Sequence, residues 1–198
     1  KKTKKDTDHI LTPKALFKYS PNHMRKSSND VRLNHLNIFS LDRLNSSDNF
    51  ESGANATLGF DYKLKNLDKE LNFSIGQVIN EKENKNMPDS SSLDQRFSDV
   101  VSTSNFQINK NINFNYNFSL DQNYKQINYN EFETSLNFNP VKFNLSYLEE
   151  REHIGNQEYF KAGLELTDGK NGVFAASTKR NLITNSAEYY NLSYEYIN

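Results

Sequence analysis

The feature that most constrains this chain is a strict alternation of apolar and polar residues from 112 to 120. Successive side chains of a β-strand point to opposite faces, so this period of two predicts a strand with one apolar and one polar face. The apolar positions are Ile112, Phe114, Tyr116, Phe118 and Leu120, and the polar positions are Asn113, Asn115, Asn117 and Ser119.

The same period recurs from Ala54 onward and predicts an all-β, antiparallel fold of about nine strands, with no helix. Residues 1–53 show no sustained period and carry turn-forming clusters around Pro13 and Pro21. We therefore expect an irregular polar segment over 1–53 that leads into a sheet over 54–198. The expected strands cover 54–64, 71–79, 98–109, 112–120, about 127–138 and about 173–180. Three more are marked by their alternating residues: one begins with 141–147, one contains 160–166 and the last contains 190–196.

The length of these strands favours a membrane barrel over a soluble β-sandwich. Eleven residues at about 3.3 Å each, tilted by about 40°, rise roughly 28 Å, which matches the apolar band of an outer-membrane barrel. The turns at 65–69, 109–111, 139–140 and 167–172 are short, whereas most of the intervening connections are longer, as in outer-membrane barrels. A sandwich also alternates its faces, so a soluble surface β-domain for adhesion stays open as an alternative.

Composition excludes several function classes. Lys and Arg number 24 against 25 Asp and Glu, which argues against a nucleic-acid binder that works through positive charge. The chain has no cysteine, so disulfides, cysteine zinc sites and thiol nucleophiles are excluded within these residues. No apolar run is long enough for a transmembrane helix. A mean hydropathy of −0.87 still suits a barrel, because half of each strand faces a wet lumen.

The usual catalytic constellations do not occur in the sequence. It contains no Gly-x-Ser-x-Gly elbow, no phosphate-binding glycine-rich loop and no His-Glu-x-x-His motif. The four histidines are scattered, and their spacing does not predict convergent metal ligands. We therefore expect a non-enzymatic protein with no catalytic residue, cofactor or metal site.

A set of residues between 37 and 62 resembles the C-terminal barrel region of the lipopolysaccharide-assembly outer-membrane protein family LptD, also called OstA or Imp. The matching positions are Asn37, Ile38, Phe39, Ser40, Arg43, Asp48, Glu51, Gly53, Thr57, Gly59 and Tyr62. Further matches follow in the right order at 73–77, 98–101 and 191–195, so the resemblance covers about 13–198. Leu44, Ser47 and Asn49 depart from the family pattern.

The resemblance implies part of an antiparallel outer-membrane β-barrel of a Gram-negative cell. Such a protein assembles lipopolysaccharide and translocates it to the outer leaflet without covalent chemistry. The implied partners are lipopolysaccharide, an LptE-like plug lipoprotein, and an LptA-like periplasmic bridge reached through an N-terminal domain outside this sequence. Another outer-membrane barrel, such as a porin or a ligand-gated transporter, stays open.

The barrel interpretation assigns roles to particular residues. Phe114, Tyr116 and Phe118 should face lipid, while Asn113, Asn115 and Asn117 should face the lumen.

A second set of expectations concerns the family-motif residues and the ends of the chain. Arg43 should pair with Asp48 or Glu51, since a shielded charge needs a partner. Asn37, Phe39 and Gly53 complete the structural motif that the resemblance implies. The resemblance also implies an internal piece of a longer chain, with a signal peptide upstream and a cysteine within about five residues after Asn198.

Overall fold

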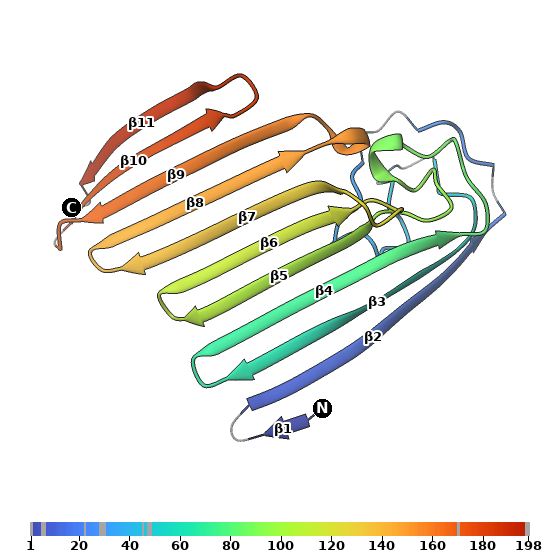
Figure 1. Cartoon of the computed structure of the whole chain (residues 1–198), viewed down its shortest axis with the longest axis horizontal. Coiled ribbons are helices and arrows are strands. Elements are labelled where there is room, and N and C mark those ends of the chain that lie inside the picture. The colour runs from blue at the N-terminus through green and yellow to red at the C-terminus, as the bar shows by residue number, and fades with distance from the viewer. Residues whose placement is uncertain are drawn as a thin grey trace.

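The chain forms one antiparallel sheet, with its strands ordered as they follow in the sequence (Figure 1). The structure is a computed structural model that describes residues 2–4, 7–21, 23–27, 31–44, 46, 49–169 and 171–196. The strands are β1 Lys2–Lys4, β2 Thr7–Ser20, β3 Gly53–Asn66, β4 Lys69–Asn80, β5 Val100–Asn109, β6 Ile112–Leu120, β7 Ile127–Phe138, β8 Val141–Glu150, β9 Gln157–Thr167, β10 Gly172–Asn181 and β11 Ser186–Tyr196. Within the described residues, the only helices are the 3-10 turns η1 Asp89–Ser91 and η2 Glu152–Ile154.

The predicted fold class is confirmed. The nine expected strands correspond to β3 through β11, and several extend by a few residues beyond the predicted ends. The sheet is open, because β1 and β11 lie at its two edges and do not pair with each other in the described part of the chain. This is the arrangement of a partial barrel. No helix among the described residues is long and apolar enough to cross a membrane.

The expectation of an irregular segment over 1–53 is wrong for β2. This strand pairs with β3 along its whole length, from Thr7 opposite Asn66 to Ser20 opposite Gly53. Pro13 lacks a backbone N–H and argued against a strand, but β1 covers only the first residues of β2. At Pro13, β2 therefore pairs with β3 but not with β1. The missing N–H of Pro13 costs no hydrogen bond on the side where β2 has no partner strand.

The connections differ at the two ends of the sheet. Tight turns join β3 to β4, β5 to β6, β7 to β8 and β9 to β10 at one end, on the left of Figure 1. The described residues of the segments 21–52 and 81–99 gather at the opposite end, on the right. We call these segments the first and second long loops. Short turns at one end and longer loops at the other are typical of outer-membrane barrels.

The strand register sorts all side chains onto two faces. Asn115 of β6 lies opposite Asn105 of β5 and Glu133 of β7, so these three share one face. We call it the polar face, and the opposite one the apolar face. The apolar face carries large exposed side chains from β2 to β11, among them Phe17, Phe60, Phe106, Phe132, Phe143, Phe160, Tyr190, Leu192 and Tyr194.

Candidate functional site: the polar face and the loops packed on it

The two long loops enclose the buried apolar cluster of this chain, and they do so on the polar face. Phe39 packs against this cluster from the first long loop. The opposite face has no such cover in the described residues, which distinguishes this sheet from one layer of a β-sandwich. The cluster consists of Met24, Leu33, Ile38, Leu44, Val78, Met87, Leu93 and Val101.

A pair of glycines lets the first long loop approach the sheet. Gly59 of β3 lies opposite Gly76 of β4, and both belong to the polar face. A Cβ added at Gly76 would lie 3.0 Å from Ile38 Cδ1 and 3.2 Å from a ring carbon of Phe39. A Cβ at Gly59 would overlap the carbonyl oxygen of Ile75. The missing side chains therefore form the notch that receives Phe39 and Ile38.

We predict that Gly76→Val displaces the loop from this notch. Overfilling a packed contact costs about 1–3 kcal/mol, and the free energy of unfolding should fall by that amount. Gly163→Val is the matched control, because a Cβ there meets nothing closer than 3.9 Å. Denaturant titration of both variants checks this. Equal losses at the two glycines would contradict the docking of Phe39.

A buried ion pair fixes the first long loop to the sheet. Arg43 donates from Nε to Glu51 Oε2 at 3.0 Å and from Nη2 to Glu51 Oε1 at 2.9 Å. The side chains of Arg43 and Glu51 are 0% and 4% exposed. Arg43 Nη2 also donates to Asn55 Oδ1 on β3 at 2.7 Å, and Lys18 Nζ on β2 lies 3.1 Å from Glu51 Oε2. The predicted pairing of Arg43 with Glu51 is confirmed, whereas Asp48 lies outside the described residues.

The other family-motif residues shape the backbone around this pair. Asn37 donates from Nδ2 to the carbonyl of Arg32 at 2.9 Å, and its Oδ1 accepts from the N–H of Asn34 at 2.8 Å. Gly53 begins β3 with a φ of +96°, a conformation that side chains disfavour. Asn37 thus shapes the turn that presents Phe39, and Gly53 turns the chain into the strand.

The strand asparagines hydrogen-bond across the polar face. Asn117 Oδ1 accepts from Thr103 Oγ1 at 2.6 Å, and its Nδ2 donates to Glu131 Oε2 at 2.9 Å. Asn105 donates from Nδ2 to Asn113 Oδ1 at 3.2 Å and also to Asn115. These side chains are half-buried, so the face offers amide and carboxylate groups that polar solutes can reach.

A second buried polar cluster centres on Asp99, and sequence reasoning missed it. Asp99 Oδ2 accepts from Ser119 Oγ at 3.0 Å and from Asn128 Nδ2 at 3.2 Å, and it lies 2.9 Å from His153 Nε2. The hydrogen bond with Asp99 raises the pKa of His153, despite the opposing effect of burial. Asp94 and Asp121 raise this pKa further.

We predict that His153 titrates above its ordinary value of 6.5 in the folded protein. A raised folded-state pKa means that the contact stabilises the fold fully below pH 6.5 and loses that effect as pH rises through the folded pKa. NMR titration of the imidazole measures the shift, and Asp99→Asn should reduce it. A folded-state pKa below 6.5 would contradict the contact.

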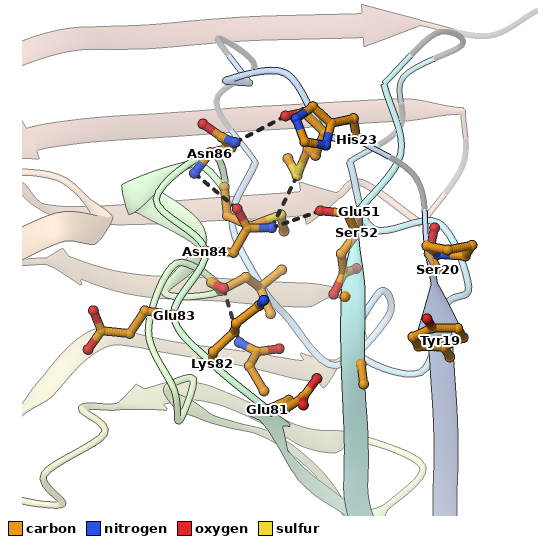
Figure 2. A pocket seen from close by; sticks show the side chains of 17 residues that line it. Tyr19, Ser20, His23, Glu51, Ser52, Glu81, Lys82, Glu83, Asn84 and Asn86 are labelled. Carbon is orange, nitrogen blue, oxygen red and sulfur yellow. Dashed lines mark hydrogen bonds between the residues drawn. The ribbon is translucent and has the colours of Figure 1, made fainter.

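A polar cavity of about 420 Å³ lies beside the ion pair, under the long loops. Figure 2 shows Tyr19 and Ser20 from the end of β2, Ser52 before β3, and Asn84 and Asn86 from the second long loop around it. Asn86 donates from Nδ2 to the carbonyl of Met24 at 3.0 Å, which ties the two loops together. No group of three or more His, Asp or Glu suited to a metal occurs among the residues that the structure describes.

Comparison with known proteins decides the family. Residues 1–194 match the family described as LptD, LPS transport system D. The chain belongs to the LptD family. This membership gives it a role in lipopolysaccharide transport as part of an outer-membrane family, and it confirms the resemblance in the sequence. A search of curated proteins finds no match.

Proposed function

We propose that this LptD-family sheet is part of the wall of an outer-membrane barrel that translocates lipopolysaccharide to the outer leaflet, without covalent catalysis. The observation that carries the proposal is the contrast between the two faces of one sheet. The apolar face stays uncovered across the described strands, while the polar face holds the loops and the hydrogen-bonded asparagines. A position between lipid and water would let the apolar face contact lipid and the polar face contact water.

The dimensions of the strands suit this role. From β2 to β11 the strands contain nine to fourteen residues, which rise about 23–35 Å at a barrel tilt near 40°. In this arrangement Phe114, Tyr116 and Phe118 face lipid, and the odd residues of β6 from Asn113 to Asn117 line the lumen.

Lipopolysaccharide, the proposed cargo, has an apolar part and a polar part, as the two faces of the sheet do. The acyl chains of lipopolysaccharide belong with lipid, and its sugars need hydrogen-bonding groups such as the amides and hydroxyls of the polar face. We therefore assign these residues to the barrel wall along which the cargo passes.

The proposal includes two protein partners. An LptE-like plug lipoprotein would contact the polar face over β10 and β11, which the long loops do not cover. Asn191 and Ser193 are exposed there. An LptA-like bridge would deliver lipopolysaccharide through a periplasmic domain upstream of this sheet.

Depletion of the full-length protein tests this function. Newly made lipopolysaccharide should stop reaching the cell surface, as read by labelling with a reagent that cannot cross the outer membrane. Depletion of a porin is the matched control and should leave surface lipopolysaccharide unchanged. Normal delivery after depletion would contradict the proposal and favour another barrel function.

A further inference from the structure

A second depression lies on the polar face, away from the long loops. It measures about 280 Å³ and spans β6 to β11. Gly163 of β9 forms part of its floor, because an added Cβ there would meet nothing closer than Asn144 at 3.9 Å. The polar-face residues around it are Asn115, Glu133, Ser135, Asn144, Ser146, Lys161, Ser177 and Tyr189.

The lining of this depression has the chemistry of a sugar-binding surface. Serine hydroxyls both donate and accept hydrogen bonds, and asparagine amides offer both functions, as the hydroxyl groups of a sugar require. Ser135 Oγ donates to Asn144 Oδ1 at 2.6 Å, which orients the amide and leaves its Nδ2 as a donor. Glu133 adds a carboxylate acceptor, and Tyr189 adds an aromatic ring at the edge.

Two lysines beside the depression, Lys161 and Lys179, repel each other when no ligand is bound. Lys161 of β9 lies directly opposite Lys179 of β10, and like charges in such a pair destabilise a sheet. Both ammonium groups approach the ring of Tyr159, at 4.8 and 4.3 Å from its centroid. Lys179 pairs with Glu188 at 2.6 Å. Lys161 forms no ion pair in the described part of the chain and interacts with Glu188 only through its charge, at longer range. Lys161 therefore offers a positive charge that an anion could satisfy.

We propose that this depression binds an acidic saccharide, a sugar that carries a phosphate or carboxylate group. Lys161 contacts the anionic group, while Asn144 and Ser146 contact ring hydroxyls. The inference rests on the proposed function and makes β7–β10 a subsite for the charged sugars of the cargo. The cavity under the long loops suits an anion less well, since three carboxylates, from Glu51, Glu81 and Glu83, outnumber its one lysine. The depression has one carboxylate, from Glu133, and one lysine.

Photo-crosslinking of the full-length protein in cells tests the subsite. A photoreactive benzoylphenylalanine replaces Ser177, beside Lys161, or Thr103, on the polar face of β5. Both positions should crosslink lipopolysaccharide. Lys161→Gln should lower crosslinking at Ser177 by about tenfold, the scale of one charged hydrogen bond, and leave Thr103 unchanged. Lys161→Arg should retain most of it.

Lys142→Gln is the matched control. Lys142 belongs to the same face but already pairs with Glu165 at 3.1 Å, so its loss should not alter crosslinking at Ser177. An equal effect of Lys161→Gln at Ser177 and Thr103, or none at either, would overturn the subsite while leaving the transport function intact. Failure of both positions to crosslink would count against the proposed function itself.

Competition identifies the anionic group. Glucose 6-phosphate, glucuronate and glucose are added in turn to the purified full-length protein with lipopolysaccharide, and crosslinking at Ser177 is measured. Stronger competition by glucose 6-phosphate assigns a phosphate, and stronger competition by glucuronate assigns a carboxylate. Equal competition by glucose would overturn the role of Lys161 as an anion contact.

Discussion

Replacement of Glu51 by Ala should lower the free energy of unfolding by about 3–5 kcal/mol, because it leaves a buried guanidinium without its counter-charge. The side chain of Arg43 is 0% exposed, and both of its bonds to Glu51 would be lost. Asn55 would remain as a neutral acceptor, which does not balance the charge. The effect should therefore exceed that of losing an exposed ion pair, which contributes at most about 1 kcal/mol.

A double-mutant cycle measures this coupling. Urea titration of the full-length protein is compared for Glu51→Ala, Arg43→Met and the double variant. The double variant should be more stable than Glu51→Ala alone, since removing both charges leaves none unpaired. Lys63→Met is the control, because the pair of Lys63 with Glu70 is partly exposed. Simple additivity of the two single changes would contradict a coupled, buried pair.

Phe114→Lys should destabilise the barrel by about 2–4 kcal/mol, whereas Asn115→Lys should be mild. The two residues are neighbours on β6 and have opposite faces. A lysine in place of Phe114 would put an ammonium group into lipid, and one in place of Asn115 would reach water. Folding titrations in lipid vesicles compare the two variants. Equal sensitivity at the two positions would contradict the assignment of the faces.

Local periodicity was sufficient to predict most of the sheet. The alternation from Ile112 to Leu120 sets both the strand and its two faces, and the structure shows β6 with the same bounds. The sequence did not predict β2, because Pro13 interrupts the strand pattern. Ile10 and Leu16 also break the alternation, since they are apolar residues on the polar face. Pairing with β3 along the whole strand overrides that weak local signal.

Of the two buried polar clusters, the sequence could predict the one around Arg43 but not the one around Asp99. Arg43 and Glu51 are eight residues apart, so their pairing could be proposed from one short segment. Asp99 and His153 are 54 residues apart, and they meet only because β5 through β8 stack in register and place η2 beside the start of β5. No local spacing encodes such a contact. The Ser98-Asp99 strand start was the one available signal, and it named no partner.

Cysteine scanning across β6 in the full-length protein tests whether one face of the sheet meets lipid and the other meets water. Each residue from Ile112 to Leu120 is replaced in turn, and outer-membrane preparations are treated with a small, charged maleimide that reacts only with thiols in water. We expect reaction with a period of two, strong at Asn113, Asn115 and Asn117 and weak at Phe114 and the other even positions. Uniform labelling along the strand, or strong labelling at the even positions, would contradict a wall with lipid on one face and water on the other.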